Sequence, residues 1–471
     1  MRVSLAALLA GCVLAVTGCG GSENTAATGG EGAASIVPKS AAVYLSVDTD
    51  LDSKQVNQLE DLLRKFPDRG KLFEEFQTGP ADQQLDWKTD VEPALGKTLD
   101  LAVLGLDRED AVAILKPGDE AKLNALLAKS DDKPVTRKVE GWTLIADDAA
   151  TLDRFVNARA DGSLENNARF QDAMSELPDD ALAKLYVNGA AAMAAADKAG
   201  AASGSKNTLD AFAAALGAES SGLRLDGALK ADLQDDFASV QPYEPKLLDA
   251  APKGAYAFLS GNGYGKVGES LKGVPGLYDQ LRRYLGIDTD ALAGLVEGEF
   301  AVWVSKGIPI PEVTFLSEAK DGKASLAAVD RLVRMMAASG NAERRTTEVD
   351  GVPATQVVVS GITVTYAAFD GKVIVTTRPG AIADVRNGGD SLADDSTFAD
   401  AQKDADMGDT TFGFLYLDIP ELVELVEGYA GLSGESIPPE VSRNLEPLGT
   451  FLLQTGGEPE DLKLSAFLAI D

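Results

Sequence analysis

The strongest constraint on the fold is an internal repeat. Residues 38–46 (PKSAAVYLS) return as residues 252–260 (PKGAYAFLS), 214 positions later. Residues 163–173 likewise match residues 391–401, at an offset of 228. Because the order is kept and the offset grows slowly, the elements correspond while loop lengths differ. A chain of this kind is expected to fold as two copies of one module.

Two further matches extend the repeat. The segment LYVN at 185–188 matches LYLD at 415–418 at an offset of 230, and the last strand expected in each half, 223–232 and 462–471, matches at an offset of 239. Aromatic residues recur at matched positions, which predicts a shared core rather than a shared ligand. The matched pairs are Tyr44/Phe258, Phe170/Phe398 and Tyr186/Tyr416.

We therefore predict a first module over residues 35–235 and a second, its internal duplicate, over residues 245–471. In each half, short β-rich runs separated by tight turns alternate with amphipathic helices. A hairpin around the Glu140-Gly141 turn is one example. This pattern favours α+β modules of mainly antiparallel sheet with interspersed amphipathic helices. The alanine-rich stretch 189–204 is expected to be a loose helix or a mobile surface segment.

The start of the chain is typical of a bacterial lipoprotein signal. Arg2 precedes 14 residues without a charge, which suits a signal peptide and is shorter than the ~18 residues of a spanning helix. Cys12 and Cys19 each follow an aliphatic and two small residues. Cleavage before Cys12 would leave only 11 residues, and cleavage before Cys19 leaves 18. We predict a signal peptide over residues 1–18 and lipidation of Cys19; use of Cys12 would require a start codon upstream of Met1.

Residues 19–34 are rich in Gly, Ser, Ala and Thr, which predicts a flexible tether. The expected location is the extracytoplasmic face of the cell membrane, with the membrane as a partner through the lipid anchor. Once Cys19 is acylated and Cys12 is removed, no free thiol remains, so a disulfide or a cysteine nucleophile is not expected.

Composition excludes several function classes. The chain has no histidine, which removes Ser-His-Asp triads and His-ligated zinc. The net charge of −31 would repel nucleic acid and anionic lipid headgroups, so neither is an expected partner. We expect no cofactor. A pair of carboxylates acting in hydrolysis stays open, because it needs neither histidine nor cysteine.

Three motifs resemble ligand sites. Residues 263–268 match G-x-G-x-x-G, but the equivalent junction at 47–52 has no glycine, so we interpret the match as a glycine-rich connection. Ser203 and Lys206 form a Ser-x-x-Lys in a linker, without the other motifs of penicillin-recognising enzymes.

The acidic run after the first strand is a weak calcium candidate. Asp48, Asp50 and Asp52 are spaced like the first ligands of a calcium loop, but Ser53 and Leu59 stand where such loops have glycine and glutamate. Helix capping explains Asp52 and Ser53 without a metal, and no metal site is predicted beyond this candidate.

The apolar, proline-stiffened loop 307–311 replaces the polar loop 107–110 of the first half. It is interpreted either as a partner-binding element or as a contact with the other half.

The lipidation motif, the tether and the duplicated Pro-x-x-Ala-x-x-Tyr/Phe-Leu segment together resemble a family of uncharacterised lipoproteins of high-GC Gram-positive bacteria, known as a domain of unknown function. The resemblance implies an envelope location and no activity. We hypothesise a non-enzymatic binding or scaffold protein whose partner is an envelope protein or a ligand. The alternatives are a carrier of an apolar ligand between the two modules and a carboxylate-dependent hydrolase.

Overall fold

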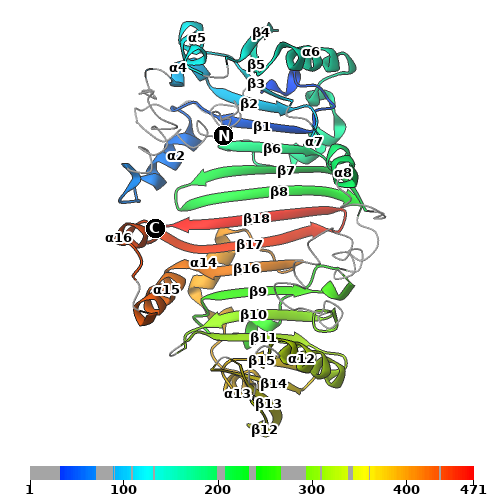
Figure 1. The fold of residues 1–471 in the computed structure, drawn as a ribbon, viewed down its shortest axis with the longest axis vertical. Coiled ribbons are helices and arrows are strands. Elements are labelled where there is room, and N and C mark those ends of the chain that lie inside the picture. The colour runs from blue at the N-terminus through cyan, green and yellow to red at the C-terminus, as the bar shows by residue number, and fades with distance from the viewer. Residues whose placement is uncertain are drawn as a thin grey trace.

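The computed structural model describes residues 32–70, 89, 91–107, 110–130, 133–198, 207–232, 240–266, 293–307, 310–337, 343–359, 361–433 and 436–471. The strands form one sheet of 18 strands, and neighbouring strands in the described part are antiparallel (Figure 1). Helices lie on both faces of the sheet. The predicted α+β class, with mainly antiparallel sheet and interspersed helices, is confirmed.

The strands of each half follow one another across the sheet in the same order. From its outer edge inward, the first half contributes β4 (Val135–Val139), β5 (Trp142–Ala146), β3 (Ala111–Leu115), β2 (Thr98–Val103), β1 (Val43–Asp48), β6 (Ala183–Asn188), β7 (Thr208–Glu219) and β8 (Gly222–Asp232).

The second half contributes β12 (Glu343–Val349), β13 (Val352–Val359), β14 (Ile362–Phe369), β15 (Lys372–Thr376), β11 (Glu312–Glu318), β10 (Glu299–Ser305), β9 (Ala257–Asn262), β16 (Gly413–Asp418), β17 (Leu448–Glu458) and β18 (Asp461–Ile470). The hairpin of β12 and β13 has no counterpart in the first half. Outside this hairpin, the second half runs β14, β15, β11, β10, β9, β16, β17 and β18 across the sheet, which repeats the order of the eight strands of the first half.

The helices also recur in corresponding places. The first half has α2 (Lys54–Leu63), α4 (Glu92–Leu95), α5 (Glu120–Ala128), α6 (Ala149–Ala158), α7 (Ala168–Ser175) and α8 (Gly189–Lys198). The second half has α12 (Gly322–Ala337), α13 (Ala381–Asn387), α14 (Ser396–Asp404), α15 (Ile419–Ser433) and α16 (Pro439–Leu445). Short 3-10 helices include η1 (Ala33–Ser35), η6 (Leu247–Ala250), η7 (Tyr264–Lys266) and η8 (Leu392–Asp394).

Local sequence explains where the elements begin and turn. The side chains of Ser53, Asp119 and Asp148 accept hydrogen bonds from first-turn N–H groups of α2, α5 and α6, and so fix the helix starts. The predicted β4–β5 hairpin turns at Glu140 and Gly141, whose φ angles of 49° and 85° match a two-residue turn that favours glycine.

The two halves join edge to edge through their last strands. β8 pairs with β18, and Asp226 lies opposite Ser465 in this ladder. These two residues are 239 positions apart, the same offset that relates β8 to β18 in sequence. The pair therefore marks a pseudo-two-fold axis through the middle of the sheet. The module boundaries and their origin in a duplication stay predictions.

One face of the sheet, named the aromatic face, carries the first half's main core. Tyr44 of β1 lies opposite Tyr186 of β6. The ring of Phe170, from α7, contacts both, with centroid distances of 5.9 Å and 5.0 Å. Edge-to-face packing of this kind adds about 0.5–1.5 kcal/mol per pair beyond area burial.

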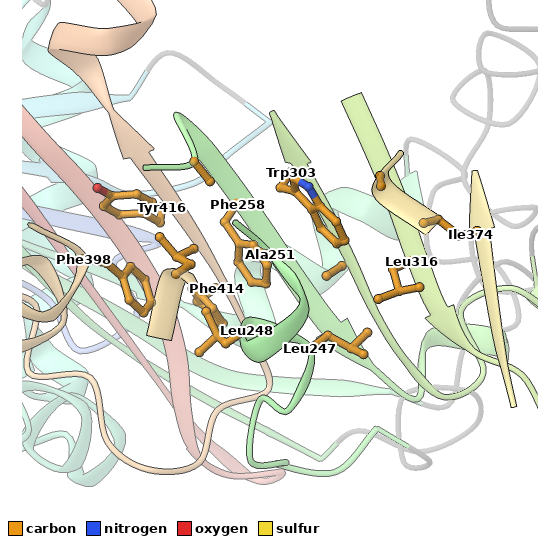
Figure 2. Packing of buried hydrophobic residues seen from close by; sticks show 14 of the residues in the cluster. Leu247, Leu248, Ala251, Phe258, Trp303, Leu316, Ile374, Phe398, Phe414 and Tyr416 are labelled. Atoms are coloured by element: carbon orange, nitrogen blue, oxygen red, sulfur yellow. The ribbon is translucent and has the colours of Figure 1, made fainter. Parts of the chain in front are cut away.

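The second half builds the same core. Phe258 of β9 lies opposite Tyr416 of β16, and Phe398 of α14 packs edge-on against Tyr416 at 5.0 Å (Figure 2). Phe258 stacks on Phe414 at 5.3 Å, and Trp303 of β10 extends the core toward the outer strands. The aromatic residues matched in the sequence therefore occupy equivalent, buried positions.

Two details differ from the sequence expectations. The end of the predicted tether is folded, because Ala33 is buried in η1, and Ile36 and Val37, which follow it, join the first core. Residues 1–31 lie outside the described residues. The described part of the alanine-rich stretch is helix α8, and the alanine-rich strand β7, which low β-propensity concealed, follows it.

Candidate functional site

The face of the sheet opposite the aromatic face has an unusual composition. Alternate residues of a strand point to opposite faces, and the strand registers show which residues share a face. From β2 across to β10, and leaving out the bulge at Asp210, the positions on this face are Leu, Val, Ile, Phe, Ala or Gly, with Thr455 as the exception among the described strands. We call this surface the leucine face.

The aromatic face of the same strands carries the charges. Its positions include Asp100, Arg224, Asp226, Lys230 and Glu299. Antiparallel sheets with one covered face normally place apolar residues under the cover and polar residues outside. Here the arrangement is reversed. The charged residues lie on the face that α6, α7, α13 and α14 cover, and the opposite face is apolar.

The middle of the leucine face is incompletely covered. Leu216, Leu225 and Leu259 are 39%, 38% and 43% exposed. Ala215 and Phe258, which precede Leu216 and Leu259 in their strands and lie on the other face, are buried. Partly exposed residues continue the same surface on the neighbouring strands, namely Leu45, Leu101, Leu185, Leu229, Val302, Leu415, Leu453 and Leu464.

The described helices cover the margins of the leucine face and leave its middle uncovered. Helices α4 and α5 pack on β2, β3 and β5, and α12 packs on β11, β14 and β15. Helix α2 packs at one end of the central strands, against Ala218, Leu223, Leu468 and Ile470. In Figure 1 helix α14 lies behind the strands, so the view is onto the leucine face, and no helix is drawn in front of the middle of β8, β18 and β17.

This surface can bind apolar groups and little else. Each central strand is paired on both sides, so its backbone N–H and C=O groups are already hydrogen-bonded within the sheet. The described side chains of its middle offer no charge. Contiguous exposed apolar surface of this kind marks a ligand, partner or membrane contact site.

A separate cavity of about 210 Å³ lies on the aromatic face beside η6, β10 and α13. Trp303, Arg378 and Asp384 line it. Arg378 forms ion pairs with Asp384 and, at 2.5 Å, with Glu312. The cavity is smaller than the roughly 300–1,000 Å³ of ordinary small-molecule sites. Of the acidic side chains that line it, Asp384 is held in an ion pair by Arg378.

Two acidic side chains are buried at strand β2 and strand β10. Asp100 accepts hydrogen bonds from the Tyr44 hydroxyl at 2.6 Å and from Thr98 at 3.3 Å, and burial raises its pKa. Glu299 accepts a hydrogen bond from the backbone N–H of Leu247 at 2.8 Å, and burial raises its pKa to about 7. The two residues lie in different halves, so they do not form a pair of carboxylates, and each stabilises the core of its own half.

The calcium candidate does not form a joint site. The Asp48 carboxylate accepts the N–H of Asp50 at 2.9 Å, and the Asp50 carboxylate accepts the N–H of Asp52 at 3.2 Å. Lys97 already provides a cation, 2.9 Å from Asp50. Within the described ranges, no three acidic, His or Cys side chains converge in a way that suits a metal ion. The run makes turns that lead into α2, and Ser53 caps that helix.

Several predicted features fall outside the described residues. These are Cys12 and Cys19, the Ser-x-x-Lys at 203–206, the end of the G-x-G-x-x-G segment, and the tip of the loop at 307–311. The described start of the glycine-rich segment forms η7, and the Tyr264 hydroxyl there donates to the backbone carbonyl of Phe412 at 3.2 Å. This contact ties the segment to the core.

The leucine face was missed by the sequence reasoning, although a signal was present. The alternation Leu462-Lys463-Leu464-Ser465 marks a strand with one apolar side. Periodicity does not reveal which side the helices cover.

Comparison with known proteins gives a family and no activity. A family model described as "Protein of unknown function (DUF3352)" matches residues 119–468. No curated protein matches the chain. Crystal form IV of TP0453 is 13% identical, with a TM-score of 0.26 over 47% of this chain and 77% of that chain. Crystal form I is 14% identical, with a TM-score of 0.25 over 47% and 75%. Similarity this low supports no argument about function.

Of the described helices, none has the length and apolarity to cross a membrane.

Proposed function

Since this chain belongs to a family of proteins of unknown function (DUF3352), we propose its role from its own geometry. It is a cell-envelope lipoprotein, anchored through Cys19, that binds an apolar ligand on the leucine face and acts as a binding protein rather than an enzyme. Two duplicated modules, 35–235 and 245–471, build this surface together. The form of binding that the surface favours is that of a carrier.

The observation that carries the proposal is the inverted distribution of polarity across the sheet. Charged residues such as Arg224 and Glu299 lie on the helix-covered aromatic face, while Leu225 and Leu259 stay more than a third exposed on the other. Exposed apolar area costs free energy of about 25 cal/mol per Å² relative to burial. A ligand that covers this face recovers that free energy, at about 0.8 kcal/mol for each CH₂ group that it buries itself.

A scaffold for a polar partner is less well supported. Such a role would use charged and hydrogen-bonding groups to fix the partner's orientation. On the leucine face the central strands offer Thr455 as their one polar side chain in the described part. The lining therefore suits a ligand recognised by shape and apolarity.

The proposed anchor keeps such a protein at the membrane surface. Two or more acyl chains at Cys19 would hold it stably, whereas one chain binds only reversibly. Removal of residues 1–18 takes away one arginine and leaves a net charge of −32, from 42 basic and 74 acidic residues. This charge keeps the domains from lying flat on an anionic bilayer, so the leucine face stays accessible.

Binding of the neutral dye N-phenyl-1-naphthylamine tests the proposal. The Cys19→Ser chain is used, so that no covalent lipid competes. We expect saturable fluorescence enhancement that Leu259→Glu weakens at least tenfold. Leu106→Glu is the matched control, because Leu106 is 44% exposed but lies beyond the end of β2, away from the leucine face. Equal dye binding by the two variants, both with wild-type circular dichroism, would refute the proposal.

A further inference from the structure

We infer that the ligand of the leucine face is the acyl portion of a membrane lipid, lying across the strands. This inference rests on the proposed function and specifies its ligand class. The supporting observations are the polarity of the face, the geometry of its leucine rows and the charge of the whole chain.

The polarity of the face separates an acyl chain from a protein partner. Protein interfaces are about 56–65% apolar and carry about one hydrogen bond per 100–200 Å². The middle of the leucine face has no charged side chain in its described strands, and its strands are paired on both edges. A protein placed here would bury its own polar groups without partners, at a cost for each. Hydrocarbon has no polar groups to satisfy.

The strand registers arrange the side chains in rows that run straight across the sheet. Leu101, Leu45 and Leu185 lie opposite one another on β2, β1 and β6, and the row continues through Ala214, Gly227 and Leu464. The pseudo-two-fold axis repeats this row in the other half. The equivalent residues are Val302, Leu259, Leu415, Leu453, Ala466 and Leu225.

Each row is long enough to hold one lipid chain. Six adjacent strands give five spacings of about 4.8 Å, or about 24 Å. The hydrocarbon core of a bilayer is about 30 Å thick and holds two opposed chains. A row can therefore support an entire acyl chain.

The charge of the chain argues against the other occupants. A second copy seated face to face would bring together two proteins of net charge −31. An anionic bilayer surface is repelled for the same reason. Binding of a single lipid that has left the bilayer avoids both of these repulsions.

A lipid-extraction experiment tests the inference. The Cys19→Ser chain is mixed with phosphatidylcholine vesicles that contain a self-quenching, acyl-labelled phosphatidylcholine. We expect saturable dequenching as labelled lipid moves to the protein, and a lipid adduct by native mass spectrometry. Leu225→Glu and Leu259→Glu should each reduce extraction at least tenfold, and Leu106→Glu should not.

Four outcomes would overturn the inference, and the last of them would overturn the proposed function as well. Cosedimentation with the vesicles without dequenching would make the face a membrane contact. A dimer in analytical ultracentrifugation that Leu259→Glu dissociates, without lipid uptake, would make it an interface between copies. Dye binding that persists when no lipid is extracted would refute an acyl ligand and leave the proposed function standing. Loss of both dye binding and extraction in the parent chain would refute the function itself.

Discussion

Arg224 of β8 and Lys463 of β18 occupy the same position in the two halves, and each forms an ion pair with the opposite half. They lie 239 positions apart. Arg224 reaches Asp406, just beyond α14, at 2.9 Å, and Lys463 reaches Glu176, just beyond α7, at 2.8 Å. Both cations therefore lie near the end of a helix, where the helix dipole favours positive charge. The contacts are reciprocal, as they are in a symmetric dimer.

The two ion pairs between the halves are expected to differ in strength. The Arg224 side chain is 15% exposed, also pairs with Glu219 and lies 5.5 Å from the ring of Phe467, whereas Lys463 is 54% exposed. Arg224→Ala should lower the free energy of unfolding by about 2 kcal/mol, because it removes a largely buried side chain together with its ion pairs and its contact with the Phe467 ring. Lys463→Ala should cost about 0.5 kcal/mol or less. Urea unfolding at low salt measures both, and equal costs would contradict the asymmetry.

Two glycines of β8 should respond differently to alanine. A Cβ at Gly222 would lie 2.1 Å from the backbone oxygen of Leu468, which the β8–β18 ladder holds in place. A Cβ at Gly227 would meet the Leu464 side chain at 3.4 Å and the backbone oxygen of Ala213 at 3.5 Å, which are ordinary van der Waals contacts. Gly222→Ala should lower the free energy of unfolding by at least about 2 kcal/mol, and Gly227→Ala should change it by less than about 1 kcal/mol. Thermal unfolding followed by circular dichroism compares them; similar melting temperatures would show that the joint between the halves is looser than described.

Glu299 should make stability depend on pH. Burial raises the pKa of Glu299 from its ordinary 4.5 to about 7. The folded state then holds this proton more tightly than the unfolded state. The resulting stability is present in full below about pH 4.5 and is lost as the pH rises toward 7, at about 1.4 kcal/mol per unit. Between pH 5.5 and 8.5 this amounts to about 2 kcal/mol.

The Glu299→Gln variant should remove that loss. Its amide oxygen can still accept the N–H of Leu247, and it carries no charge to bury. The variant should therefore gain about 2 kcal/mol relative to the parent chain between pH 5.5 and 8.5. Glu343→Gln, at an exposed position of β12, is the control. Urea unfolding at both pH values decides, and parallel pH profiles for parent and variant would exclude this role of Glu299.

Lipidation at Cys19 is tested by replacing each cysteine in turn. Cys19→Ser should release the protein from the membrane fraction or block its processing, because the acylated residue is lost. Cys12→Ser should have little effect, since Cys12 leaves with the signal peptide. Intact-mass analysis of detergent-extracted protein identifies the modified residue. An acylated N-terminus at Cys12 would reverse the assignment.

The local elements could be predicted because local signals specify them. The turn at Glu140-Gly141 fixes a hairpin, and Ser53 starts a helix by capping it. The matched aromatic residues, such as Tyr186 and Tyr416, predicted the position of both cores. The strand β7 was missed because its alanines have little preference for a sheet, and pairing with β6 and β8 decides its conformation.

The candidate site could not be predicted for a different reason. Alternation in β18 identifies an apolar side and a polar side, and the usual expectation places the apolar side under the helices. Which side is covered depends on how α7 and α14 cross the sheet, and that is set by contacts between distant residues such as Phe398 and Tyr416. The same limit applies to the joint between the halves, because a repeat in sequence does not say which strands meet.

The position of β18 has a consequence for how the protein is made. Its residues, 461–470, follow those of every other strand in the chain, yet β18 lies in the middle of the sheet between β8 and β17. Until these residues emerge from the ribosome, β8 and β17 each keep one unpaired edge. Open edges recruit strands from other chains. The nascent protein is thus most prone to aggregation just before β18 is made, and it is at this moment that folding factors would act.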